Sequence, residues 1–126
     1  MRKINILTID DDFINLKLLE AMLKSHESVG EIIKATNGLD GLNIIDQRDD
    51  IDLVLLDIVM PVMNGLEFLD NLKARKNAFS KPVIVITTDE AVKREAFNKG
   101  ANDFLTKPIL KKVLLEKIDK LIVDFE

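Results

Sequence analysis

Leu53-Val54-Leu55-Leu56-Asp57 is the stretch that decides the fold, because four apolar residues run without interruption into a carboxylate. Continuous apolarity, in place of alternation, is typical of a strand that is buried on both faces. Similar runs occupy residues 4–9, 32–36 and 83–86, and a weaker one lies at residues 104–105. We therefore predict strands that begin near residues 4, 32, 53, 83 and 103.

Longer stretches with helical spacing separate these runs. Apolar residues recur three or four positions apart in three of them: Leu16, Leu19 and Leu23; Leu66, Leu69 and Leu72; Leu114, Ile118 and Leu121. The other gaps are long enough for one helix each. A strand–helix alternation that repeats five times predicts a doubly wound α/β fold. We expect a five-stranded parallel sheet flanked by five helices, and if the strand order is 2-1-3-4-5, strands 1 and 3 are neighbours.

The composition limits the possible functions. A chain of 126 residues, of which 47% are hydrophobic, suits one domain over residues 1–126. The net charge of -4 argues against direct binding to nucleic acid, which needs a basic surface. The absence of cysteine excludes disulfides, zinc thiolates and cysteine nucleophiles. No apolar run approaches the roughly 20 residues of a membrane span, so we expect a cytoplasmic protein.

Chemically reactive residues follow four of the five predicted strands. The first strand ends in Asp10-Asp11-Asp12, the third in Asp57, the fourth in Thr87 and the fifth in Lys107. Ligands of open parallel sheets bind beyond the carboxyl ends of the strands, where these side chains should converge. Clustered carboxylates raise one another's pKa unless a cation lies between them. We therefore predict a Mg²⁺ site and expect Asp12 to cap the following helix.

The same side chains suit phosphoryl transfer. A carboxylate can attack phosphorus, and a cation reduces the repulsion between nucleophile and phosphate. Lys107 can hold a phosphoryl oxygen, and the Thr87 hydroxyl can donate a hydrogen bond to it. Each residue alone has an ordinary explanation as a turn, a cap or a loop residue. Their occurrence together at four strand ends favours a functional site.

At these residues the chain resembles the receiver domain of two-component response regulators, the CheY-like family with its flavodoxin-like fold. The matching segments are residues 6–12, 53–65, 82–88 and 100–108, in the order and spacing of the family. Each segment is moderately specific and the four together are highly specific. The resemblance covers essentially the whole chain.

The resemblance assigns a role to each residue of the predicted site. It implies that Asp57 is the phosphoacceptor, that Asp11 ligates Mg²⁺ or Mn²⁺ directly, and that Asp10 assists through water or hydrogen bonds. The backbone carbonyl of Val59 would be the third protein ligand. Lys107 and Thr87 would be the other catalytic residues.

Signalling residues are implied in the same way. Thr87 would be the switch hydroxyl and Phe104 the switch aromatic, which moves between an outward and an inward rotamer when Thr87 moves. Phe104 stands where tyrosine is commoner, and Thr88 where alanine is usual. The lone histidine, His26, is expected to be a surface residue without function.

The resemblance also implies partners. The phosphodonor would be a sensor histidine kinase or a phosphotransfer protein. A downstream partner or output domain would bind the region around Phe104 and the last helix, predicted over residues 109–125. Most apolar residues of that helix are expected in the core, with Leu115 or Ile122 as candidates for a partner or homodimer face: Leu110, Val113, Leu114, Leu115, Ile118, Leu121, Ile122 and Phe125.

Three alternatives remain at this point. A degenerate receiver would bind partners without phosphorylation, although all the reactive residues are present. A hydrolase that turns over phosphoesters would need a substrate pocket and a cap domain. A flavin-binding electron carrier is disfavoured because the chain has no Trp and no Tyr to stack on the flavin. We expect no enzyme in the usual sense, since a receiver catalyses only its own phosphorylation and dephosphorylation.

Overall fold

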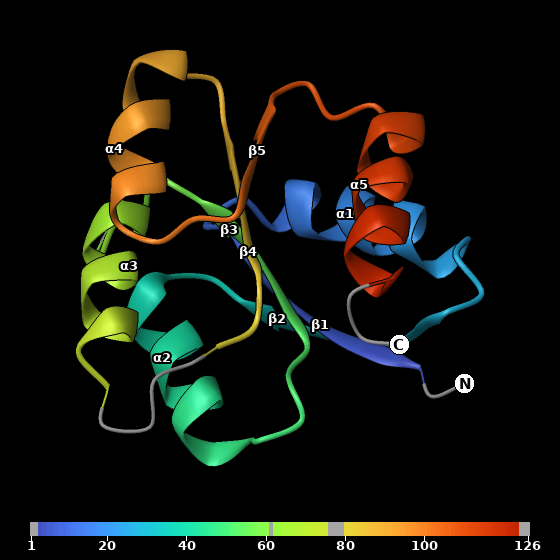
Figure 1. Cartoon of the computed structure of the whole chain (residues 1–126), viewed down its shortest axis with the longest axis horizontal. Coiled ribbons are helices and arrows are strands. Elements are labelled where there is room, and N and C mark those ends of the chain that lie inside the picture. Colours follow the sequence, from blue (N-terminus) through green and yellow to red (C-terminus); the bar gives the residue numbers. More distant parts are fainter. Residues whose placement is uncertain (1–2, 61, 76–79, 124–126) are drawn as a thin grey trace.

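The computed structural model describes residues 3–60, 62–75 and 80–123. The chain alternates between strands and helices (Figure 1). The strands are β1 (Ile4–Ile9), β2 (Val29–Ala35), β3 (Leu53–Asp57), β4 (Val83–Thr87) and β5 (Asp103–Thr106). The helices are α1 (Phe13–Lys24), α2 (Gly38–Gln47), α3 (Gly65–Lys73), α4 (Lys93–Asn98), preceded by the short 3₁₀ helix η1 (Glu90–Val92), and α5 (Lys111–Val123).

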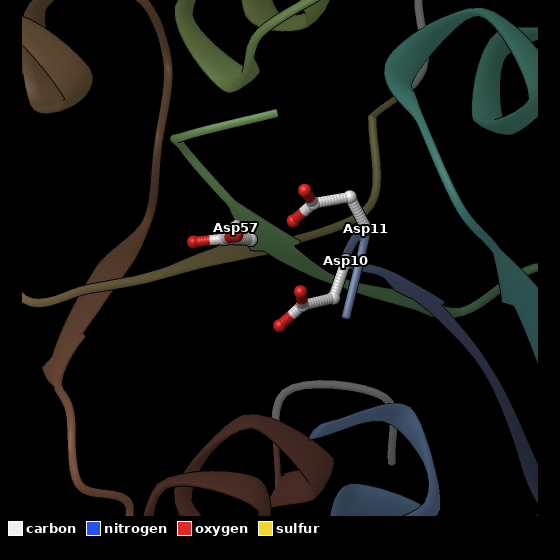
Figure 2. Close-up of side chains that lie close together, drawn as sticks. All are labelled: Asp10, Asp11 and Asp57. Carbon is white, nitrogen blue, oxygen red and sulfur yellow. The ribbon is translucent and has the colours of Figure 1, made fainter. Parts of the chain in front are cut away.

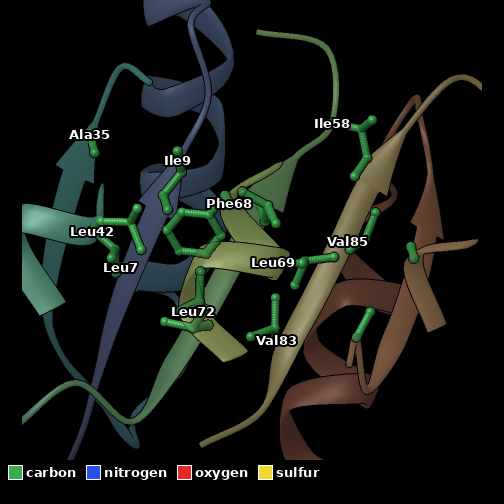
Figure 3. Close-up of a cluster of buried hydrophobic side chains, with 14 of the residues drawn as sticks. Leu7, Ile9, Ala35, Leu42, Ile58, Phe68, Leu69, Leu72, Val83 and Val85 are labelled. Carbon is green, nitrogen blue, oxygen red and sulfur yellow. The ribbon is translucent and has the colours of Figure 1, made fainter. Parts of the chain in front are cut away.

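All neighbouring strands pair in parallel in the order β2-β1-β3-β4-β5, as the sequence predicted. The sheet separates two hydrophobic clusters. Helices α2, α3 and α4 cover one face, where Phe68, Leu69 and Leu72 of α3 pack on β1 and β4 (Figure 3). Helices α1 and α5 cover the other face, where Leu19 of α1 and Ile118 of α5 are buried (Figure 1). The order of the strands therefore brings the carboxyl ends of β1 and β3 side by side.

The central strands behave as their sequence predicts, whereas the edge strand β2 does not. Every residue of β3 and β4 is buried, which confirms strands covered on both faces. Strand β2 begins at Val29, three residues before the predicted start, and exposes Gly30 and Glu31. The prediction was wrong there because an edge strand needs no continuous apolar run. Its pairing with β1 also shifts register after Ile4.

The expectation that most apolar residues of the last helix lie in the core is confirmed for the side chains that the structure describes, with two exceptions. Leu114 and Ile118 are buried and Leu115 and Leu121 are partly buried, but Leu110 and Val113 are 64% and 37% exposed. Helix α5 packs beside the edge strand β5, so only a narrow stripe of its surface faces the core. The side chain of Ile122 and residue Phe125 lie outside the described part of the chain.

The structure also corrects the expectation for His26. Its side chain is only 11% exposed, and Nε2 is hydrogen-bonded to Asp119 of α5. The backbone N–H of Ser28 donates to Nδ1 at 3.1 Å. Because α5 packs over the loop that follows α1, the imidazole connects these two segments. It is a structural link instead of a freely solvated side chain.

A polar network holds the amino-terminal edge of the sheet, opposite the carboxylates. The Asn5 N–H donates to Asp52 at 2.9 Å, and the Asp52 N–H donates to the Asn5 carbonyl at 2.9 Å. The guanidinium of Arg48 bonds both Glu31 and Asp50, at 2.8 and 2.7 Å. These hydrogen bonds tie β1, β2 and the start of β3 together.

Helix α3 begins in close contact with the end of β3. The Asn64 side chain caps the helix by accepting the Glu67 N–H, and the Glu67 carboxylate accepts the Asn64 N–H. The N–H of Gly65 donates to the Ile58 carbonyl at 2.8 Å. A Cβ atom at Gly65 would lie 2.6 Å from the Asp57 carbonyl oxygen, so only glycine fits. The start of α3 is therefore held against Asp57 and Ile58 by backbone contacts.

Candidate functional site

Three carboxylates converge at the carboxyl ends of β1 and β3. Asp10 and Asp11 follow Ile9 directly, and Asp57 is the last residue of β3. Ile9 pairs with Leu56, so the two strands end at the same level of the sheet. One oxygen from each carboxylate lies within 4.8 Å of the others (Figure 2). The structure thus brings together the three acids that the sequence predicted.

Local hydrogen bonds place Asp10 and Asp11 differently. Asp10 is 3% exposed, and its Oδ1 accepts the Asp12 N–H at 2.8 Å. Asp12 in turn accepts the Ile14 N–H at 2.9 Å and caps α1, as predicted. Asp11 is exposed, and its carboxylate reaches into the crevice from the side of the β1–α1 loop (Figure 2). Asp11 therefore offers oxygen atoms to solvent that Asp10 does not.

Lys107 connects the two strands through their acids. Its Nζ lies 3.4 Å from Asp10 Oδ2 and 3.4 Å from Asp57 Oδ1. The Lys107 N–H donates to the Thr87 carbonyl at 2.9 Å, which fixes the backbone of this loop beside β4. Sequence reasoning placed this lysine at the crevice, and the structure shows it between the two buried acids.

The positive charge of Lys107 does not neutralise the three carboxylates, and the pKa of Asp57 reflects this. Burial raises the pKa of the Asp57 carboxyl to about 6, and the nearby Asp10 carboxylate adds to the rise, whereas Lys107 opposes it. An ionised Asp57 is therefore unfavourable unless more positive charge enters. Three oxygen donors, one of them solvent-exposed, suit Mg²⁺ or Mn²⁺, which keep several water ligands. The donor set fits such an ion.

The crevice around these acids has a volume of about 310 Å³. The crevice is lined by charged and polar residues at the carboxyl ends of the strands and at the start of α1, together with Val59: Asp10, Asp11, Asp12, Asn15, Asp57, Val59, Thr87, Thr88 and Lys107. Val59 is 68% exposed and lies in the loop that leaves β3. The Thr87 Oγ1 accepts the Asp89 N–H at 3.2 Å, which leaves the hydroxyl proton available to a ligand.

Phe104 lies outside the crevice, on the strand beyond Thr87. Its ring is 8% exposed and belongs to the hydrophobic cluster on the side of α2, α3 and α4. The ring is therefore mostly buried in this structure. The Lys93 ammonium of α4 also lies over the ring. The exchange of Phe104 between an outward and an inward rotamer stays a prediction.

Sequence reasoning missed Asn15, which lines the crevice from α1. The available signal was its position three residues after the Asp12 cap, on the same side of the first helical turn. It also missed Lys93, because no sequence pattern connects a helix α4 lysine with an aromatic residue on β5. In the part of the chain that the structure describes, no helix is long and apolar enough to cross a membrane.

Comparisons with known proteins agree with this geometry. A family model described as the response regulator receiver domain matches residues 6–119. Protein PilH of Pseudomonas aeruginosa is 36% identical over 119 residues, which cover 93% of this chain and 96% of that protein. A chemotaxis protein CheY homolog of Campylobacter jejuni is 26% identical and covers 93% of this chain and 91% of its own length.

Longer proteins also contain a similar segment. The hybrid signal transduction histidine kinase L of Dictyostelium discoideum is 35% identical over 91% of this chain, which spans only 7% of that protein. Among solved structures, the chemotaxis protein CheY4 of Vibrio cholerae superposes with a TM-score of 0.83 at 24% identity. That match covers 94% of this chain and 98% of the other, and it shows that the folds agree.

Proposed function

Because the chain belongs to the response regulator receiver domain family, we propose that Asp57 accepts a phosphoryl group from a histidine kinase or a phosphotransfer protein. The observation that carries this proposal is Lys107, whose Nζ lies 3.4 Å from both Asp10 and Asp57 inside a cluster of three carboxylates. A buried nucleophile, a cation-binding acid cluster and a fixed ammonium group are the parts that phosphoryl transfer needs. Receiver domains are signalling modules, and we assign the whole of residues 1–126 to one such domain.

The residues of the crevice divide the work of the transfer. An Asp57 oxygen forms the bond to phosphorus while the bond between phosphorus and the donor breaks, and the donor keeps that electron pair. Lys107 binds a phosphoryl oxygen, and the Thr87 hydroxyl donates to another. Asp11, Asp10, Asp57 and the Val59 carbonyl would hold Mg²⁺ or Mn²⁺, which supplies positive charge against the repulsion between carboxylate and phosphate.

The output would leave the crevice through β4 and β5. Thr87 ends β4, and Phe104 pairs with Val85 on the neighbouring strand. A displacement of Thr87 toward the phosphoryl group therefore acts on β5 and on α4, which covers the ring of Phe104. We propose that the downstream partner or output domain binds this face and the adjoining surface of α5, where Val113 is exposed. The same face could instead form the interface of a homodimer.

Small phosphodonors provide the test. Wild-type protein and the Asp57→Asn variant are incubated with acetyl phosphate, with MgCl₂ or with EDTA, and analysed by intact mass spectrometry. We expect one phosphoryl adduct in the wild type with magnesium, which alkali and hydroxylamine remove. We expect none with EDTA and none in Asp57→Asn.

The same experiment separates the proposal from a degenerate receiver. A degenerate receiver would gain no adduct under any condition and would bind no beryllofluoride. An adduct that peptide mapping places on Ser80 or His26 would contradict the assignment of Asp57. Repeated turnover of a phosphoester would indicate a hydrolase.

A further inference from the structure

An apolar cavity adjoins the carboxylate crevice, between α1 and the loop that connects β5 to α5. Its volume is about 400 Å³, within the roughly 300–1,000 Å³ of small-molecule sites in proteins. Its apolar walls come from both segments: Leu18, Leu19 and Met22 of α1, and Pro108 and Ile109 of the loop. Leu18 is 53% exposed although it is a large apolar residue. The cavity is therefore accessible from solvent and poorly covered by the protein itself.

The cavity and the crevice adjoin each other and share part of their lining. Four residues line both of them: Asp10, Asn15, Thr88 and Lys107. The polar groups therefore lie at one end of the cavity, where it meets the crevice, and the apolar residues form the rest. In Figure 2 the Asp10 carboxylate points toward the side on which α1 and α5 lie. A ligand that spans both spaces needs a polar, phosphate-bearing end and an apolar end.

We propose that this cavity binds the apolar leaving group of a small acyl phosphate, so that acyl phosphates with an alkyl chain of about four to six carbons are better phosphodonors than acetyl phosphate. This inference rests on the proposed function of Asp57. The phosphoryl group occupies the crevice beside Lys107 and Thr87, and the acyl chain lies against Leu18, Leu19 and Met22. The carboxylates of the crevice repel an anionic tail, which limits the tail to neutral, apolar groups.

The reaction is balanced without a further reactant. The Asp57 carboxylate forms an O–P bond, the P–O bond to the acyl group breaks, and the electron pair leaves with the released carboxylate. No proton is exchanged. The product is an anion beside Asp10 and Asp11, so repulsion favours its departure from the crevice.

Second-order rate constants for a series of alkyl acyl phosphates test the cavity. Acetyl, butyryl and hexanoyl phosphate have similar leaving groups and differ mainly in apolar length. Because the chain has no tryptophan, phosphorylation is followed by intact mass spectrometry. We expect a gain of about threefold for each methylene that enters the cavity, and at least about tenfold for hexanoyl over acetyl phosphate. Equal rate constants across the series would overturn the inference.

A matched pair of variants locates the effect. Leu18→Gln places a polar amide in the cavity, whereas Leu39→Gln makes the same change on α2 at a residue that is 46% exposed and outside the cavity lining. The ratio of the hexanoyl to the acetyl rate constant should fall at least about threefold in Leu18→Gln. It should be unchanged in Leu39→Gln. An equal ratio in both variants would show that the preference for the longer acyl chain does not arise in this cavity.

A binding measurement gives a readout that does not depend on transfer. Hexylphosphonate carries the apolar chain but cannot donate its phosphoryl group, and methylphosphonate lacks the chain. We expect hexylphosphonate with MgCl₂ to shift the ¹³C-methyl signal of Met22, and methylphosphonate to leave it in place. No shift of Met22 with hexylphosphonate would overturn the inference. Phosphorylation of Asp57 by acetyl phosphate without any gain from longer chains would reject the cavity alone, whereas no adduct from any donor would reject the proposed function with it.

Discussion

The ammonium group of Lys93 lies 5.8 Å from the centroid of the Phe104 ring, so that a cation on α4 covers an aromatic residue on β5. Such a contact is worth about 0.5–1 kcal/mol at an exposed site. The contact connects α4 to β5, which lies next to β4, the strand that ends in Thr87. The position of Phe104 is therefore coupled to α4 as well as to β4.

Thr87→Ala should weaken the response of the Phe104 region to phosphorylation. Without the hydroxyl, nothing draws the end of β4 toward a phosphoryl group, whose coupling to the distant face is on the order of 1–3 kcal/mol. Asp57 should still form a beryllofluoride complex in this variant. The measurement is amide NMR shifts of Phe104 and Lys93 with and without beryllofluoride. Equal shifts in wild type and variant would show that Thr87 is not the coupling residue.

The contribution of Asp57 to the stability of the protein without divalent cations should fall as pH rises from about 4 to about 6. In this window native Asp57, with its pKa raised to about 6, retains a proton that the unfolded chain releases near 3.8. The native state therefore binds more protons, and the free energy of unfolding decreases with increasing pH. Asp57→Asn should remove this decrease and stabilise the protein at pH 7 by about 1–3 kcal/mol. Urea unfolding in EDTA, followed by circular dichroism, measures both; parallel pH profiles would contradict the prediction.

Magnesium should stabilise the protein at pH 7, where Asp57 is ionised. A tenfold excess of the ion over its dissociation constant adds about 1.4 kcal/mol to the free energy of unfolding. Asp11→Asn should remove most of this gain. Asp12→Asn is the matched control, because asparagine caps a helix as well as aspartate and Asp12 is bonded to Ile14. Thermal unfolding with and without MgCl₂ measures the gain, and an undiminished gain in Asp11→Asn would place the ion elsewhere.

Gly65→Ala should destabilise the protein by about 1–3 kcal/mol, because the new Cβ would meet the backbone of Asp57 and Ile58. Gly41→Ala is a useful comparison, since its Cβ would meet the terminal methyl group of Ile9, which a rotamer change can move. We expect a smaller loss there. Urea unfolding of both variants measures the difference, and a harmless Gly65→Ala would show that the loop after Asp57 is adaptable.

Val62→Gly should stabilise the protein by about 1 kcal/mol. Val62 has a φ of 67°, which is unfavourable for a β-branched residue, and its side chain is 77% exposed and loses little contact on removal. Val59 is 68% exposed in the same loop and has no positive φ to relieve. Val59→Gly should therefore destabilise the protein, because glycine raises only the conformational entropy of the unfolded chain. Unfolding midpoints of the two variants should move in opposite directions.

The sequence predicted the features that depend on burial and strand order. Leu53–Asp57 and Val83–Thr87 are continuous apolar runs because both of their faces are covered, and their ends therefore place Asp57 and Thr87 at one edge. The alternation of such runs with helices predicted the parallel sheet, and the family resemblance implied the strand order. The convergence of the three acids follows from that topology alone.

Other features depend on contacts that no local pattern contains. Helix α4 has six residues and no side-chain cap, so its sequence gave no periodic signal. The partial burial of His26 and the exposure of Leu110 both result from where α5 packs. The contact between Phe104 and Lys93 joins β5 to α4, two elements whose sequences show no common pattern.

The polar network of Asn5, Arg48 and Asp52 has a mechanical consequence. It fastens the amino-terminal ends of β1, β2 and β3 to one another, while the opposite ends carry charges that repel. Hydrogen bonds thus hold these strands together at their amino-terminal ends, whereas carboxylates repel one another at their carboxyl ends. We therefore expect the amino-terminal ends of these strands to move less than their carboxyl ends when the charge between the carboxylates changes.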